Sequence, residues 1–213
     1  METLKNKTAQ FISHAFHPLF MPTFGLLFFY FSGQISRFSS SDSYQENNLS
    51  IIGITLLFSL VLPTIGVAIL KKTGRVSSFQ MHHREERFLP FTITGISLFC
   101  GYFILFELLP IEIDFVLRIF YFGCILSVIA ALGISLKWKI SVHMIGIGGF
   151  TGAIFLMSKL TEKVYLDELI GALLLSGLIA FSRLHLNAHS FNQIVAGFAL
   201  GFGCETFALL ILP

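Results

Sequence analysis

Charged residues are scarce in this chain. Aspartate, glutamate, lysine and arginine together form 12% of its 213 residues, whereas a soluble domain carries about 25%. The scarcity excludes an ordinary water-soluble domain, and the formal net charge of +2 indicates no particular partner. The sequence has no basic patch with interleaved aromatic residues either, so we expect no nucleic-acid partner.

Cysteine is also rare. The three cysteines, Cys100, Cys124 and Cys204, each lie inside an apolar run, far from one another in the sequence. Their odd number argues against a disulfide framework, and their separation offers no metal-ligand spacing. We interpret them as small buried hydrophobic residues.

Long apolar runs, by contrast, are abundant. Hydrophobic residues form 54% of the chain, which includes 25 phenylalanines. Because about 20 apolar residues cross a bilayer as a helix, the sequence predicts an all-α, polytopic transmembrane bundle of about six to seven membrane helices. A single domain, residues 1–213, is the natural count for this length. The candidate spans are 15–33, 49–70, 88–109, 115–136, 141–158, 166–182 and 190–212, and residues 34–48 are expected to form a polar loop.

Two pairs of glycines occur late in the chain. Gly148 and Gly152 lie four residues apart in the fifth span, and Gly197 and Gly201 have the same spacing in the seventh. This spacing allows helix backbones to approach closely in lipid. We therefore expect the fifth and seventh helices to pack tightly against each other.

Basic residues are distributed unevenly between the two sides of the predicted bundle. The N-terminus and the connections after the second, fourth and sixth spans share one side. Cytoplasmic loops are enriched in lysine and arginine, so we predict an integral protein of the cytoplasmic membrane with its N-terminus and this side in the cytoplasm. The basic residues of this side are Lys5, Lys7, Lys71, Lys72, Arg75, Arg84, Arg87, Lys137, Lys139 and Arg183.

Three polar clusters lie on this same side. They comprise residues 81–90, 137–143 and 182–193, and each precedes an apolar span. Two spans separate each cluster from the next, and an even number of crossings returns the chain to the same face. The pattern predicts that all three meet at one membrane surface, where polar groups are costly and tend to be functional.

The clusters contain the donors that a phosphate group requires. Phosphoryl transfer depends on cations around the phosphate oxygens, because positioning and charge stabilisation supply most of the catalysis. Arg84, Arg87 and Arg183 offer forked donors that match phosphate geometry, and Ser141 offers a hydroxyl.

Two histidines accompany these donors. Histidine can attack phosphorus to form a covalent intermediate, and a second histidine can protonate the leaving oxygen. His143 and His189 are placed to divide these roles, and Gln193, one helical turn after His189, is expected to orient its ring. The spacing of His185 and His189 is also compatible with a metal or haem ligand pair, although no carboxylate or cysteine accompanies them.

These residues resemble the signatures of the type 2 phosphatidic acid phosphatase superfamily, which also contains the vanadium haloperoxidases. The family carries the motifs Lys-x6-Arg-Pro, Pro-Ser-Gly-His and Ser-Arg-x5-His-x3-Asp. The resemblance covers roughly residues 71–201. The third motif is matched by Ser182, Arg183 and His189, with Gln193 in place of Asp. The second motif is matched by Ser141 and His143, with Ile140 and Val142 in place of Pro and Gly. The first motif is approximated by Arg84, Arg87 and Pro90.

The resemblance implies a membrane phosphatase that needs neither metal nor cofactor. Its substrate would be a phospholipid or polyprenyl phosphate or pyrophosphate in contact with membrane lipids, and the enzyme would be a phosphoric monoester or acid anhydride hydrolase. His189 would form a phosphohistidine, His143 would be the general acid and Gln193 would support the nucleophile. The phosphate would be bound by Arg183, Arg87, Arg84, Ser141 and Ser182.

Two other interpretations remain open. Gln193 and Val142 depart from the family pattern and are compatible with a catalytically degenerate relative that binds or moves phosphorylated lipids without hydrolysis. The clusters can also be read as interfacial residues that set topology in a structural membrane protein.

Four further polar residues receive roles outside the proposed site. We interpret Lys137 and Lys139 as orientation signals, although either can replace the signature lysine of the family. His17 is expected at the membrane interface beside the first span. Glu205 lies deep in the last span, and three alternatives are open for it: a pair with Arg118, a pair with another polar residue, or a position near the far interface.

Overall fold

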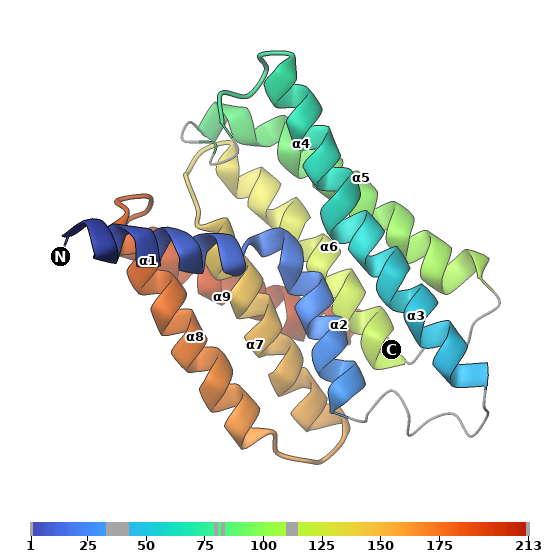
Figure 1. The fold of residues 1–213 in the computed structure, drawn as a ribbon. Coiled ribbons are helices and arrows are strands. Elements are labelled where there is room, and N and C mark those ends of the chain that lie inside the picture. The colour runs from blue at the N-terminus through green and yellow to red at the C-terminus, as the bar shows by residue number, and fades with distance from the viewer. Residues whose placement is uncertain (1, 33–42, 79–80, 82–83, 110–114, 212–213) are drawn as a thin grey trace.

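The chain folds into a bundle of helices (Figure 1). The structure is a computed structural model and describes residues 2–32, 43–78, 81, 84–109 and 115–211. These residues form no strand, which confirms the predicted all-α class. Within the described part of the chain, seven helical segments are long and apolar enough to cross a membrane, so the chain is an integral membrane protein, as predicted. They are Leu4–Phe31, Leu49–Lys72, Arg84–Leu108, Phe115–Ser135, Val142–Leu160, Leu166–His185 and Phe191–Ile211.

The first of these segments contains two helices rather than one. Helix α1 (Glu2–Ala15) is separated from α2 (Met21–Phe31) by a short 3-10 turn, η1 (Pro18–Phe20). His17 adopts an extended backbone before Pro18 (φ −63°, ψ 138°), because the proline ring disfavours a helical conformation in the preceding residue. The expected span 15–33 was therefore wrong at its start, where an independent helix ends.

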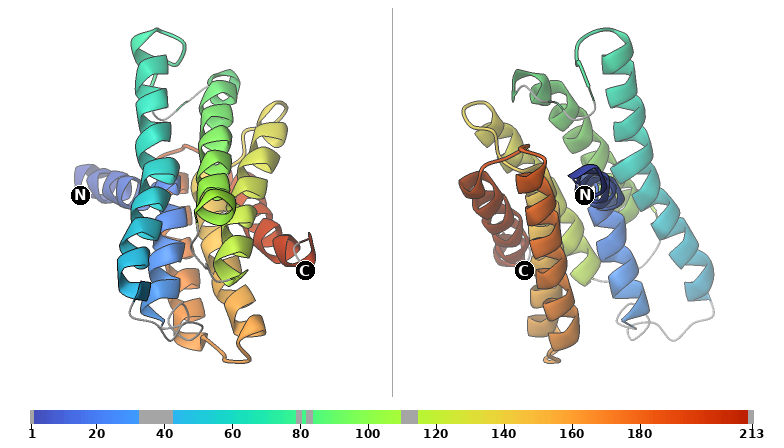
Figure 2. Two further views of the ribbon diagram at one scale, coloured as in Figure 1. Left: turned by 90° about the vertical axis from the view of Figure 1, so that its right-hand side faces the viewer. Right: turned by 60° about the vertical axis from the view of Figure 1, so that its left-hand side comes forward.

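Helix α1 lies across α8 (Leu166–His185) rather than along it (Figure 1). The second view of Figure 2 shows α1 end-on while α8 runs along the page. The exposed side of α1 carries the apolar residues Leu4 and Phe11 together with Lys5 and Lys7. This composition is typical of a helix that lies in the plane of the membrane interface.

The second and third spans each contain a π-helical turn. In the second span, α3 (Ser43–Leu56) continues through η3 (Leu57–Val61) into α4 (Leu62–Lys72); in the third, η4 (Arg84–Arg87) and α5 (Phe88–Phe103) are followed by η5 (Ile104–Leu108). The expected polar loop 34–48 was wrong at its end, because α3 already begins at Ser43, and residues 34–42 lie outside the described residues. Gln45 and Glu46 are good helix formers and extend the apolar helix backwards.

The contact between the fifth and seventh spans holds the candidate residues together. Helix α7 (Val142–Leu160) packs closely against α9 (Phe191–Ile211), and a side chain at Gly148 or Gly201 would collide with the backbone of the other helix. The expected tight packing of the fifth and seventh spans is thus confirmed. Helix α6 (Phe115–Ser135) flanks this pair.

Glu205 is buried inside this packed region, at 1% exposure. Its carboxyl group lies against Gly123 of α6 and Gly149 of α7 and accepts a hydrogen bond from the Cys124 thiol at 3.7 Å. Arg118 instead forms an ion pair with Glu107 at 3.4 Å. The candidate pairing of Glu205 with Arg118 was therefore wrong.

Candidate functional site

The first polar cluster is joined to the second by two arginines. Arg84 Nη1 donates a hydrogen bond to the main-chain oxygen of Lys137 at 2.7 Å, and Arg87 Nη1 donates to that of Ile140 at 2.8 Å. Both carbonyl groups belong to the connection between α6 and α7. The start of the third span therefore lies directly against this connection, at one end of the bundle (Figure 1).

The second cluster is joined to the third through the main chain. The backbone N–H of Ser141 donates to the main-chain oxygen of Gln193 at 3.3 Å. A side chain at Gly197 would meet the main-chain oxygen of Ser141, so the absence of a side chain there allows this approach. All three clusters thus converge at one end of the bundle, as the number of crossings predicts.

His189 is oriented by Gln193. The side-chain oxygen Oε1 of Gln193 accepts a hydrogen bond from the backbone N–H of Ser190 at 3.2 Å and contacts His189 Nδ1 at 3.1 Å. Because an amide oxygen only accepts, Nδ1 of His189 carries the hydrogen and Nε2 keeps its lone pair. The expected contact is present, and it leaves the nitrogen suited to nucleophilic attack unprotonated.

Three cations lie within electrostatic range of His189. Burial is the main cause that lowers the pKa of His189 to about 3; the hydrogen bond that His189 donates to Gln193 opposes the shift, while the charges of Arg183, Arg87 and Lys139 add to it. His189 is therefore a neutral imidazole near pH 7, held beside an accumulation of positive charge. Such an accumulation favours an anionic ligand.

Lys139 belongs to this group of cations. Burial lowers its pKa, and the charges of Arg87 and Arg183 lower it further. Like charges gathered in a partly buried place are costly, and an anion that joins them reduces this cost. This electrostatic coupling groups Lys139 with Arg87 and Arg183.

His143 lies at the start of α7. Its Nε2 contacts the main-chain oxygen of Ser13 at 3.0 Å, and its ring meets the ring of His17 edge-on, with centroids 5.6 Å apart. A carbonyl oxygen only accepts, so Nε2 carries the hydrogen. Arg183 and His189 both lie within electrostatic range of this ring.

Ser13 also contacts the third cluster. Arg183 Nη1 donates to the hydroxyl of Ser13 at 3.2 Å, and the hydroxyls of Ser13 and Ser182 are 2.8 Å apart. Ser182 donates its only hydroxyl hydrogen to the main-chain oxygen of Ala9 at 2.6 Å, so Ser13 is the donor between the two serines. The predicted contact of Ser182 with phosphate stays a prediction, since its hydrogen is directed to α1.

Two donors of the site have no hydrogen-bond partner among the described residues. They are the hydroxyl of Ser141, which is fully buried, and Nε of Arg183. A buried donor without a partner costs about 1–3 kcal/mol. An oxyanion that accepts from both would remove this cost and would also meet the surrounding cations.

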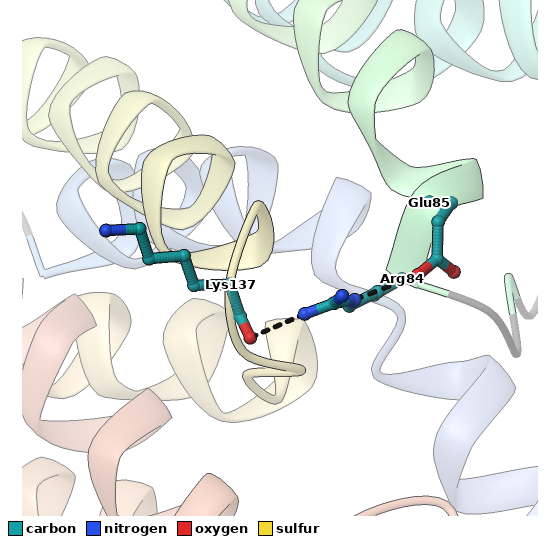
Figure 3. A network of polar contacts seen from close by, with 3 residues as sticks. All are labelled: Arg84, Glu85 and Lys137. Atoms are coloured by element: carbon teal, nitrogen blue, oxygen red, sulfur yellow. Dashed lines mark hydrogen bonds and ion pairs between the residues drawn. The ribbon is translucent and has the colours of Figure 1, made fainter.

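Arg84 and His185 lie apart from this group. Arg84 is exposed and bonds to Glu85 at 2.9 Å, and Figure 3 shows it between Glu85 and the main-chain oxygen of Lys137. His185 contacts Asn6 Oδ1 through Nε2 at 2.8 Å and stacks on Phe181. In the described part of the chain, no group of three or more histidine, cysteine, aspartate or glutamate side chains is placed to hold a metal ion.

Ser13 and His17 contact the site but were not predicted as site residues. Both belong to the N-terminal segment, more than 120 positions before His143. The available signal was the His17–Pro18 pair, which indicates a helix break, and such a break allows α1 to turn back over the end of the bundle.

Comparisons with known proteins found no relative of this chain. No family model, no curated protein and no solved structure matches the chain.

Proposed function

We propose that this chain is an integral membrane phosphatase that hydrolyses a lipid phosphate or pyrophosphate through a phosphohistidine on His189. The observation that supports the proposal is the convergence of Arg87, Lys139 and Arg183 on a neutral His189 whose Nδ1 hydrogen points to Gln193. A nucleophile with a free lone pair beside clustered cations is what attack on a phosphate monoester requires.

The reaction would follow from these positions. His189 Nε2 attacks phosphorus, the bond to the leaving oxygen breaks, and a protonated His143 gives that oxygen a proton. Water then attacks the phosphohistidine, His143 takes a proton from the water, and inorganic phosphate leaves. Arg183, Arg87 and Lys139 offset the charge on the phosphate oxygens in both steps.

The surroundings of the site favour a lipid as substrate. The site lies at one end of a bundle whose outer surface is rich in exposed apolar side chains, such as Phe99 and Phe103 of α5 and Leu174 of α8. A lipid whose tails lie beside these helices would present its phosphate at the level of the site. We place this end of the bundle at the cytoplasmic face of the cytoplasmic membrane, from the distribution of lysine and arginine.

The test uses purified protein with phosphatidate, phosphatidylglycerophosphate and polyprenyl diphosphate in detergent micelles. We expect wild type to release phosphate from at least one of them and His189→Ala to release at least about a thousandfold less. A base-stable, acid-labile label on the denatured protein after reaction with a radiolabelled substrate would identify the phosphohistidine. Equal release by the two proteins would refute the proposal for these substrates.

A second candidate is a protein that binds or moves phosphorylated lipids without hydrolysis. The observation that favours it is the partner of His189, a neutral amide that stabilises an imidazole cation less than a carboxylate does. It predicts saturable binding of lipid phosphate that persists in His189→Ala, with no phosphate release by wild type.

The side of the membrane can be tested separately. A single cysteine introduced at Lys137, in a variant whose three native cysteines are replaced, is expected to react with a membrane-impermeant maleimide only after the cells are opened. Labelling of intact cells would place the site on the outer face.

A further inference from the structure

The N-terminal helix supplies contacts to three residues of the candidate site. Ser13 bonds to Arg183 and Ser182 through its hydroxyl and to His143 through its main-chain oxygen. It is buried at 6% exposure. Ser13 thus joins α1 to both Arg183 and His143.

The contact with His143 parallels the contact that orients His189. In each case an acceptor oxygen holds the hydrogen on one ring nitrogen, the amide oxygen of Gln193 for His189 and the main-chain oxygen of Ser13 for His143. The other nitrogen of each ring is then left without a hydrogen in the neutral form. When His143 gains a second proton, that proton sits on Nδ1, and the main-chain oxygen of Ser13 stabilises the resulting cation.

The contact with Arg183 restricts the guanidinium. Nη1 donates to the Ser13 hydroxyl, while Nε has no hydrogen-bond partner among the described residues. The hydroxyl of Ser13 is itself fixed, because it donates to Ser182, which donates to Ala9. This chain of hydrogen bonds orients Arg183 from the side of α1 and leaves Nε for another acceptor.

We propose that Ser13 is a positioning residue of the phosphate site, so that α1 is a part of the site and not only an interfacial anchor. This inference rests on the proposed phosphate site. Ser13 acts through Arg183 and His143: its hydroxyl sets the guanidinium, and its main-chain oxygen sets the imidazole. Its contribution to phosphate binding should therefore depend on the presence of Arg183.

The proposal can be tested by a double-mutant cycle on phosphate binding. The variants are Ser13→Ala, Arg183→Ala and the double variant, and the probes are inorganic phosphate and orthovanadate, followed by calorimetry of the full-length protein in micelles. Binding is measured directly, so the test does not require turnover. Thr8→Ala is the matched control, because Thr8 is exposed on the same helix and its hydroxyl bonds to the main-chain oxygen of Leu4 within α1.

We expect Ser13→Ala to weaken phosphate binding about tenfold, the effect of losing a hydrogen bond to a charged group. Ser13→Thr, which keeps the hydroxyl, should restore most of this loss, and Thr8→Ala should bind as wild type. In the Arg183→Ala background, Ser13→Ala should have no further effect, because residues that act through one another are not additive. In turnover, Ser13→Ala should raise KM more than it lowers kcat.

Two results would overturn the inference. Wild-type affinity of a folded Ser13→Ala variant would do so, and so would a loss that adds in full to that of Arg183→Ala, since a purely structural role predicts additivity. The proposed function fails differently: phosphate binding in wild type with no hydrolysis would refute the phosphatase and leave the positioning role standing. Absence of phosphate and vanadate binding in wild type would refute both.

Discussion

Replacing Gln193 by glutamate is the sharpest single change at this site. The side chain keeps its length, and its oxygen can still accept from the Ser190 N–H and from His189 Nδ1 at the present distance of 3.1 Å. The substitution adds one negative charge beside the imidazole. It therefore tests whether the charge state of His189 is controlled by this neighbour.

The magnitude follows from Coulomb's law. A carboxylate and an imidazolium about 4 Å apart, in an effective dielectric of about 20, attract each other by about 4 kcal/mol, which corresponds to about 3 pKa units. Bringing the carboxylate into this partly buried position reduces the gain. We therefore expect the pKa of His189 to rise from about 3 by about 1–3 units.

The assay is an NMR titration of ring-labelled histidine in the purified protein. The resonance of His189 is assigned by its absence in His189→Ala, and its pKa is compared between wild type and Gln193→Glu. Asn192→Asp is the matched control, because it adds a negative charge at the neighbouring, exposed position of α9. We expect the control to leave the pKa of His189 within about half a unit of wild type.

The result that would refute the reasoning is equally specific. A pKa of His189 that is unchanged in a folded Gln193→Glu variant would mean that residue 193 does not contact the ring. A higher rate of phosphate release by Gln193→Glu than by wild type would support hydrolysis over binding alone, because a carboxylate stabilises the cationic form of the nucleophile better than an amide.

Three further predictions concern the cations, the packing and the dependence on pH. Lys139→Gln should raise the pKa of His189 and weaken phosphate binding about tenfold, measured by the same NMR and binding titrations. Lys137→Gln is the control and should change neither, because the ammonium of Lys137 points away from Arg84 (Figure 3). Gly201→Ala should destabilise the protein by about 1–3 kcal/mol because its methyl group would meet the α7 backbone, and Gly203→Ala, with open space around it, should not; thermal unfolding in detergent distinguishes them. The pKa of His189 is about 3 in the folded protein and about 6.5 in the unfolded chain, so its contribution to stability should be complete above about pH 6.5 and be lost as the pH falls towards 3. His189→Asn should remove this part of the pH dependence of Tm. An identical pH profile of Tm for both proteins would count against a buried neutral ring.

Much of the architecture was accessible from the sequence. Apolar runs of sufficient length predict the spans, and the parity of the crossings predicts that the clusters share one end of the bundle. The spacing of Gly148, Gly152, Gly197 and Gly201 correctly predicts the contact between α7 and α9. These features depend on local composition and on topology alone, which a single sequence carries.

The contacts within the site were less accessible. The contact of His189 with Gln193 was predicted from their four-residue separation, although His189 lies just before α9 and Gln193 reaches back to it from the first turn of that helix. The position of Ser13 does not, since it depends on how α1 docks across α8 after the break at His17, and no local pattern encodes that angle. The surroundings of Glu205 were equally hard to predict. Its opposite charge made Arg118 a candidate partner, but the carboxyl group lies against glycines of two other helices, and Arg118 pairs with Glu107.

The path of α1 over the end of the bundle has a consequence for biogenesis. Ser13 precedes its partners Ser182 and Arg183 by 169 and 170 residues. Helix α1 is therefore synthesised long before α8, and it can dock on this end of the bundle only after the sixth span has been made. Contacts so distant in sequence form late in folding, so chains that stop before residue 182 lack them.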